Sequence, residues 1–198
     1  MNTHSRSKIA LALLLSIALG ATGCSAQWIS VALDDMPVLL QMALNIGTVV
    51  TTLRNGKQLS PADAALIQNI STEAAKDLTL LEALYKEYKA TSSADTIRKI
   101  QNAIADINRN LPALLEAAHI SDPNLSSRIA AGVDLILSTV NSFAALIPQP
   151  AAPLHAQVMR QKAPVPHVQD LKQRWNVEVC GFPGDAVLDS SLAGCSVH

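Results

Sequence analysis

The chain has 198 residues, of which 49% are apolar and only 16% charged, enough to bury the core of one globular domain with short appendages. Its formal net charge is −1, its basic residues are scattered, and its aromatic content is 3%. These values exclude the basic patches and aromatic stacking platforms of nucleic-acid-binding proteins. We therefore expect no nucleic-acid partner.

The first 23 residues have the layout of a signal peptide. Arg6 and Lys8 precede an almost unbroken apolar run of eleven residues, Ile9 to Leu19. This run is too short to remain as a membrane anchor, because a spanning helix needs about 20 apolar residues. We expect residues 1–23 to be removed.

The stretch Ala21-Thr22-Gly23-Cys24 resembles the lipobox of bacterial lipoproteins, in which small residues precede a cysteine that receives a diacylglyceryl group. One departure is Ala21, since this position is usually Leu in the family. The resemblance implies that Cys24 becomes the lipidated N-terminus and anchors the protein to a membrane. It also implies that Ser25, in place of Asp, directs the protein to the periplasmic face of the outer membrane in Gram-negative bacteria. Two or more acyl chains hold a protein stably, whereas one binds only marginally.

The cysteine count agrees with this interpretation. Three cysteines in an exported chain leave one without an intramolecular partner. Cys180 and Cys195 lie fifteen positions apart, and an oxidising compartment favours a disulfide between them. Cys24 is then the cysteine left for the lipid. Two alternatives stay open: free thiols at both C-terminal positions, and an ordinary signal peptide cleaved at another small residue such as Ala26.

The first predicted helix follows Asp35, has Pro37 in its first turn and ends at Leu53, which makes residues 24–33 a lipidated spacer. The eighteen residues after Asp35 carry no charge, which invites a membrane-spanning interpretation. Polar side chains, among them Gln41 and three threonines, instead favour a largely buried central helix.

The second predicted helix begins at a capping box. Ser60 is the cap, Pro61 takes the first helical position and Asp63 follows, and the helix is expected to reach Tyr88 or Lys89. Its apolar residues form one stripe: Ile67, Ile70, Ala74, Leu78, Leu81, Leu84 or Tyr85, and Tyr88.

The third predicted helix has the most regular pattern, with steps of three and four that make a heptad seam. The seam comprises Ile97, Ile100, Ile104, Ile107, Leu111, Leu114 and Ala118. Pro112 removes the hydrogen bond to the carbonyl of Asn108, so a kink or a restart capped by Asn110 is expected here.

The fourth predicted helix begins at Ser121-Asp122-Pro123 and is stopped by Pro148. Its buried face is expected to hold Leu125, Ile129, Val133, Ile136, Val140, Phe143 or Ala144, and Ile147.

Four amphipathic helices with short connections, within residues 34–147, predict an all-α fold: an antiparallel up-down four-helix bundle. Two alternatives stay open. One is a three-helix core with the first helix docked across it, and the other is a long hairpin that dimerises through the seam beginning at Ile97.

Composition changes after the bundle. Five prolines within nineteen residues predict a Pro-rich linker over residues 148–168. In the C-terminal tail, residues 169–198, we expect a short helical turn from Asp170 to Arg174 and a short strand from Val177 to Val179. The disulfide is expected to staple this piece, which is too small to fold on hydrophobic burial alone.

The sequence offers little for catalysis or metal binding. Glu116 and His119 form one Glu-x-x-His step, whereas di-iron bundles need two. The other histidines considered, His155, His167 and His198, lack zinc-site spacing. No nucleophile elbow or phosphate-binding loop is present. Asp34 and Asp35 are interpreted as helix-start acids, and the pair Asp185 and Asp189 as loop acids. We expect no enzyme activity, no metal and no cofactor.

These observations predict a lipid-anchored protein of the cell envelope that acts as a structural or protein-interaction module. The alternative is a periplasmic carrier or sensor that holds a small apolar ligand within the bundle, in a cavity bordered by Gly47 and Thr48 of the charge-free first helix. A third hypothesis makes the stapled tail, residues 169–198, the element that recognises the partner.

Overall fold

In a computed structural model of the protein, residues 27–54, 59–147, 167–181 and 195–197 are described. They form helices α2 (Gln27–Arg54), α3 (Pro61–Thr91), α4 (Ala94–Ala117), α5 (Pro123–Leu146) and α6 (Val168–Trp175), and α6 continues into a π-helical segment, η2 (Asn176–Cys180). No strand occurs in these residues.

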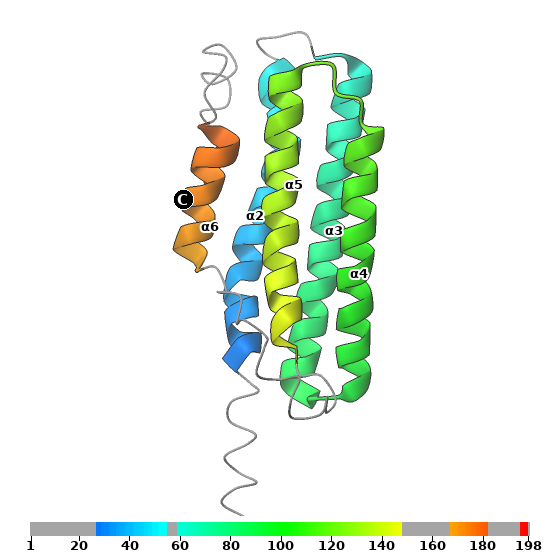
Figure 1. The fold of residues 1–198 in the computed structure, drawn as a ribbon, viewed down its shortest axis with the longest axis vertical. Coiled ribbons are helices and arrows are strands. Elements are labelled where there is room, and N and C mark those ends of the chain that lie inside the picture. The colour runs from blue at the N-terminus through cyan, green and yellow to red at the C-terminus, as the bar shows by residue number, and fades with distance from the viewer. Residues whose placement is uncertain (1–26, 55–58, 148–166, 182–194, 198) are drawn as a thin grey trace, which may run out of the picture.

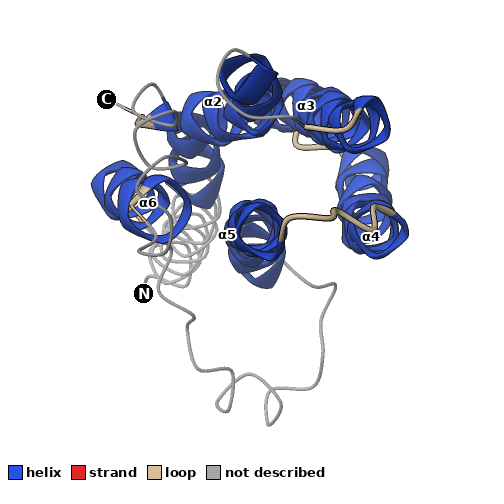
Figure 2. Ribbon diagram, turned by 90° about the horizontal axis from the view of Figure 1, so that it is seen from above, coloured by secondary structure: helices blue, strands red, loops and turns tan. Residues whose placement is uncertain are grey.

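The helices α2 to α5 run alternately up and down and pack as a closed four-membered ring, in which α5 returns to contact α2 (Figure 1). Viewed along the bundle, α6 lies outside this ring beside α2 and α5 (Figure 2). The predicted all-α, antiparallel up-down four-helix bundle is therefore confirmed, and the C-terminal tail docks on one of its sides.

Local capping signals place the helix boundaries. The amide of Asp63 donates a hydrogen bond to Ser60 Oγ (3.0 Å) at the start of α3, as predicted. At its end, Ser92 adopts a left-handed conformation (φ 50°) and donates its amide to the carbonyl of Tyr88. Ser93 then caps α4, so only two residues separate these antiparallel helices.

The start of α5 also follows the prediction. The carboxylate of Asp122 accepts hydrogen bonds from the amides of Asn124 (2.9 Å) and Leu125 (3.0 Å), and Pro123 occupies the first turn. The helix ends at Leu146, just before the predicted stop.

The predicted start of the first helix is wrong. The helix α2 begins at Gln27, so residues 27–33 belong to the bundle rather than to a spacer, and Pro37 lies inside the helix. Its apolar face explains this difference, because Trp28 and Ile29 are both buried. Burial of each large apolar side chain stabilises by about 1.5–3 kcal/mol, which offsets the roughly 3 kcal/mol that an internal proline costs.

A restart at Pro112 is also wrong, because α4 continues through this residue. Seam residues are buried on both sides of the proline, with Leu111 at 0% exposure before it and Ala118 at 1% after it. The side-chain amide of Asn108 donates to the carbonyl of Ile104 (2.9 Å) one turn earlier. Burial of the seam thus holds the helix together across the missing backbone hydrogen bond.

The heptad seam faces the inside of the bundle. Ile100, Ile104, Ile107, Leu111 and Ala118 are buried, and Ile97 and Leu114 pack at its margin. The seam is buried inside the bundle of a single chain, so it offers no surface for the dimeric hairpin considered above.

An aromatic cluster joins three helices near the start of α2. Trp28 meets Tyr85 of α3 edge to face at 5.8 Å between ring centroids, and Tyr85 meets Phe143 of α5 in the same way at 6.2 Å. The indole Nε1 of Trp28 and the hydroxyl of Tyr85 are buried without a hydrogen-bond partner in this part of the structure. The cluster fixes the relative position of the three helices by packing alone.

Two helical segments, Trp28–Thr48 and Pro123–Leu146, have the length and apolar content that a membrane crossing requires. Each packs in the bundle, with about half of its residues buried (56% and 44%). The core helices of soluble proteins share these properties, so the two segments carry no argument for a membrane-spanning fold.

Candidate functional site

The docked tail, which comprises α6, η2 and residues 195–197, makes the first of two sites. Leu171 and Trp175 are fully buried against the bundle. The indole of Trp175 lies so close to Gly132 of α5 that a Cβ atom there would stand 3.1 Å from the ring. Glycine at this position lets the largest side chain of the tail reach the interior.

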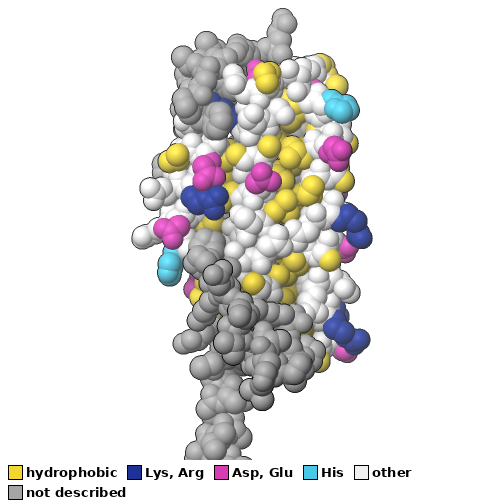
Figure 3. All heavy atoms as spheres, viewed as in Figure 1, with side chains coloured by type: hydrophobic (Ala, Val, Ile, Leu, Met, Phe, Trp, Pro, Cys, Tyr) yellow, Lys and Arg dark blue, Asp and Glu magenta, His cyan; other side chains and the backbone are white. Residues whose placement is uncertain are grey.

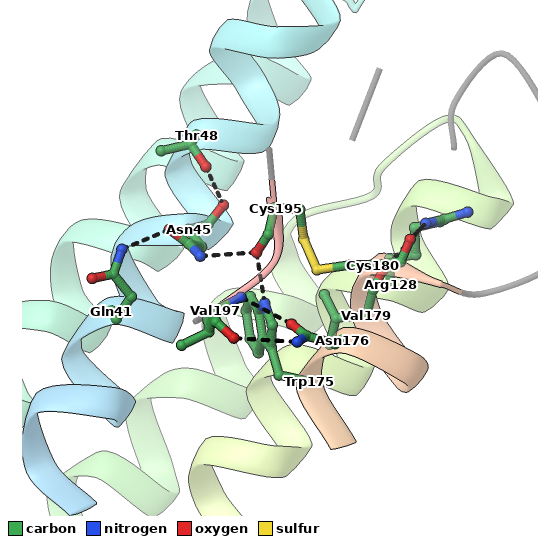
Figure 4. The surroundings of a disulfide bond; sticks show 10 residues. All are labelled: Gln41, Asn45, Thr48, Arg128, Trp175, Asn176, Val179, Cys180, Cys195 and Val197. Atoms are coloured by element: carbon green, nitrogen blue, oxygen red, sulfur yellow. Dashed lines mark hydrogen bonds between the residues drawn. A yellow bond between two sulfur atoms is a disulfide. The ribbon is translucent and has the colours of Figure 1, made fainter. Parts of the chain in front are cut away.

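A disulfide closes the tail. Cys180 at the end of η2 is bonded to Cys195, with their Cα atoms 5.7 Å apart, as in ordinary disulfides. The carbonyl oxygen of Cys195 accepts two hydrogen bonds, from Nδ2 of Asn45 in α2 (2.9 Å) and from Nε1 of Trp175 (3.0 Å) (Figure 4). The second cysteine is thereby tied both to the bundle and to α6.

Arg128 of α5 fixes the first cysteine. Its side chain is only 1% exposed, and its Nη1 donates to the carbonyls of Val179 (3.2 Å) and Cys180 (3.1 Å) (Figure 4). Carbonyls at a helix C-terminus lack partners within their helix and carry partial negative charge. The buried guanidinium supplies both hydrogen bonds and the opposite charge.

Val197, near the end of the described residues, is hydrogen-bonded to η2. Asn176 donates its Nδ2 to the carbonyl of Val197 (3.2 Å), and its Oδ1 accepts the amide of the same residue (2.9 Å). This pair of bonds leaves both polar groups of Val197 satisfied while its side chain is buried. Bundle, α6 and chain end therefore form one packed unit.

The predicted helical turn from Asp170 to Arg174 is confirmed and extended, whereas the predicted strand from Val177 to Val179 is wrong, because this segment lies in η2. Continued helix buries Val179 next to Trp175 and lets Arg174 pair with Glu178 at 2.9 Å. The helix also begins at Val168, the last residue of the predicted linker; residues 148–166 lie outside the described residues.

The second site is a cavity of about 570 Å³ between α2 and the N-terminal end of α6, which we call the acidic pocket. Its lining residues are Val31, Asp34 and Asp35 from α2, Val168 and Gln169 from α6, and His167, the N-cap residue of α6. The spacing of three and four places the α2 residues on one helix face. Docking of α6 completes the pocket, since this helix and its N-cap residue supply half of the lining.

Asp35 distinguishes this pocket from an ordinary surface cleft. The residue is 2% exposed, and its Oδ2 has no hydrogen-bond partner in the described part of the chain. Burial, reinforced by the neighbouring charge of Asp34 and opposed by His167, raises the pKa of Asp35 to about 6. Asp35 therefore exchanges its proton near neutral pH, where an exposed aspartate stays ionised.

The earlier interpretation of Asp34 and Asp35 as helix-start acids is wrong, because α2 begins eight residues before Asp35. A signal for the pocket was nevertheless present: an acid at position 35 falls on the same helix face as the apolar Trp28 and Met36. Sequence analysis also missed Arg128, a cation that lies among the buried, mostly apolar residues of α5.

Other candidate residues are not brought together. Glu116 lies near the end of α4 and His119 follows it, and both are exposed. No group of three or more His, Cys, Asp or Glu placed to hold a metal occurs in the described ranges. The remaining candidates, Cys24, His155, Asp185, Asp189 and His198, lie outside the described residues.

The residues expected to border an apolar cavity are packed differently. A Cβ atom at Gly47 would stand 2.7 Å from Ser71 Oγ of α3, whose hydroxyl donates to the carbonyl of Ala43 (2.7 Å). Thr48 is exposed and donates to the carbonyl of Asn45. Glycine serves close contact between α2 and α3 here, so these residues do not support a ligand inside the bundle.

Comparison of the chain with protein-family models, with curated proteins and with solved structures found no match in any of the three.

Proposed function

We propose that the protein is a lipid-anchored component of the bacterial cell envelope that presents its helical bundle to a protein partner at the periplasmic face of the outer membrane. The observation that carries this proposal is the position of the lipobox-like sequence: Cys24 stands only three residues before Gln27, the first residue of α2. The anchor and the folded body are thus almost contiguous.

This spacing constrains how the body would stand on the membrane. Three residues of extended chain reach at most about 11 Å, so the end of the bundle that holds the start of α2 would lie close to the lipid surface. The 28 residues of α2 extend about 42 Å away from that end. The bundle would then hold a partner within a few tens of ångströms of the bilayer.

The disulfide supports export. Disulfides persist in oxidising compartments such as the bacterial periplasm and are rare in the cytosol. Cys180 and Cys195 are bonded, which leaves Cys24 as the single cysteine for acylation.

A surface for the partner is suggested by the distribution of apolar side chains. Figure 3 shows apolar side chains gathered in a strip along the side where α4 and α5 lie, with charged side chains toward its margins. Partly buried apolar residues of these two helices include Leu114, Leu115, Leu137 and Ala144. A mixed apolar centre and polar rim is typical of protein interfaces.

The anchoring half is tested by mass spectrometry of the N-terminal peptide from the membrane fraction. We expect an acylated Cys24, and Cys24→Ala should move the protein to the soluble fraction whereas Ser25→Ala should not. An unmodified N-terminus beyond Cys24 would contradict the anchor.

The interaction half is tested by photo-crosslinking in cells, with the crosslinker placed at Leu137 and, as a control, at the exposed Lys86 of α3. We expect one discrete crosslinked protein from Leu137 and none from Lys86. Equal crosslinking from both positions would count against a partner surface on the α4–α5 side.

A further inference from the structure

We propose that the acidic pocket binds a small organic cation, a primary ammonium group on an aliphatic body, with the carboxylates of Asp35 and Asp34 as its ligands. The proposal concerns a site that the lipid anchor and the partner surface do not use; only the choice of a lipid head group as the source of the ammonium rests on the proposed anchor.

The first step is the state of Asp35. A carboxylate that is 2% exposed and has an oxygen without a partner among the described residues is costly in its ionised form. Such a group either takes up a proton or recruits a positive charge. The remaining lining of the pocket supplies one titratable base, the exposed His167, and a second acid, Asp34. The lining therefore holds two acids against one base.

The second step is the shape and composition of the pocket. Its volume of about 570 Å³ is in the range of small-molecule sites. Val31 and Val168 provide apolar walls for methylene groups, and Gln169 provides an additional polar side chain at the rim. A primary ammonium offers three donors, which two carboxylates and a side-chain amide can accept.

A divalent metal fits this lining less well. Calcium takes six to eight oxygen ligands, and magnesium demands octahedral geometry. Asp34, Asp35 and His167 line the same pocket, but no three His, Cys, Asp or Glu residues in the described ranges are placed to hold one metal ion, and the valines contribute no ligand. The apolar walls have a use only if the cation carries an organic body.

Two sources of the ammonium group share this chemistry: a free aliphatic amine and the head group of an aminophospholipid. Asp35 lies eight residues along α2 from Gln27, or about 12 Å at the rise of an α-helix. With the anchor proposed above, this distance leaves the pocket close to the lipid surface, so the experiment compares a head group with a soluble amine.

The test is isothermal titration calorimetry of the complete mature protein in detergent with diaminobutane, with butanediol as the neutral counterpart. We expect the diamine to bind at about pH 7.5 and to lose affinity at about pH 5, where Asp35 is protonated. Asp35→Asn should weaken binding by about tenfold or more and Asp34→Asn by less. The control Asp134→Asn, at an exposed position of α5, should bind as the wild type does.

A second measurement needs no variant. In the wild-type protein, the pKa of Asp35 followed by carbon NMR should fall when diaminobutane is added, because a bound cation favours the ionised carboxylate. Equal binding of butanediol, full binding by Asp35→Asn, or an Asp35 pKa unmoved by saturating diamine would overturn the proposal. Displacement of the diamine by phosphatidylethanolamine vesicles, but not by phosphatidylglycerol vesicles, would identify the lipid source; no displacement would identify the free amine. Loss of the anchor in Cys24→Ala should leave these results unchanged.

Discussion

The docked tail and the acidic pocket share helix α6, but they differ in the hydrogen bonding of their buried polar groups. In the docked tail, Asn45 and Trp175 converge on one carbonyl, and Arg128 donates to two more. In the acidic pocket, Asp35 is equally buried, yet its Oδ2 has no partner in the described structure. Buried groups that donate to defined acceptors hold the fold together, whereas a buried carboxylate without a donor is a cost that a ligand can remove.

Removal of the largest side chain of the docked tail should have the largest effect. Trp175→Ala should lower the free energy of unfolding by about 3–5 kcal/mol, because it deletes a fully buried indole and a hydrogen bond to Cys195. Chemical denaturation measures this loss. Val177→Ala, at a position 61% exposed, is the matched control. A loss below about 1 kcal/mol for Trp175→Ala would show that the tail is not part of the core.

Removal of the disulfide should rank next. The double variant Cys180→Ser, Cys195→Ser should lose roughly 3 kcal/mol, since the bridge closes a loop of fifteen residues. Denaturation of the wild type with and without reductant gives the same quantity without mutation. If the reduced protein were as stable as the oxidised one, the hydrogen bonds to Cys195 would suffice to hold the tail alone.

A substitution in the acidic pocket should act in the opposite direction. The pKa of Asp35 is raised from 3.8 to about 6, so the folded protein binds the proton more tightly than the unfolded chain does. The stability from this group is fully present below about pH 4 and is lost as the pH rises through about 6. Asp35→Asn should therefore stabilise the protein by about 2–3 kcal/mol at about pH 7.5 and have little effect at about pH 4.

The measurement is the free energy of unfolding of both proteins across this pH range, with Asp134→Asn as the control. A destabilising effect of Asp35→Asn at neutral pH would mean that the carboxylate makes a favourable contact in the folded state, and the contrast between the two regions would fail.

The smallest of these effects is expected at Asn45. Asn45→Ala removes the donor to the carbonyl of Cys195 and should cost about 1–2 kcal/mol, since Trp175 still donates to the same oxygen. A double-mutant cycle with Trp175→Phe would measure how far the two bonds depend on each other. Additive effects would argue against a cooperative network in the docked tail.

Features with local causes could be predicted from the sequence. Ser60 and Asp122 cap their helices through bonds that span two or three residues, and the seam from Ile100 to Leu111 repeats at every turn. Such signals need no knowledge of distant contacts, which explains why the inward faces of the last three helices of the bundle were predicted correctly.

Features that depend on tertiary contacts could not be predicted in this way. Pro37 reads as a first-turn residue until the burial of Trp28 shows that α2 begins earlier. Val177 to Val179 continue a helix whose Trp175 is fully buried, and the pocket around Asp35 forms only where the start of α6 meets α2. A β-branched pair around Glu178 favours a strand by propensity alone, and packing overrides it.

The pKa of the Asp35 carboxyl in the folded protein, followed by carbon NMR, tests the central contrast most directly. Our account predicts a midpoint near about 6 that falls when a primary diamine binds. A midpoint at the ordinary value of about 4, unchanged by the amine, would show that Asp35 is solvated or already partnered and would contradict the account.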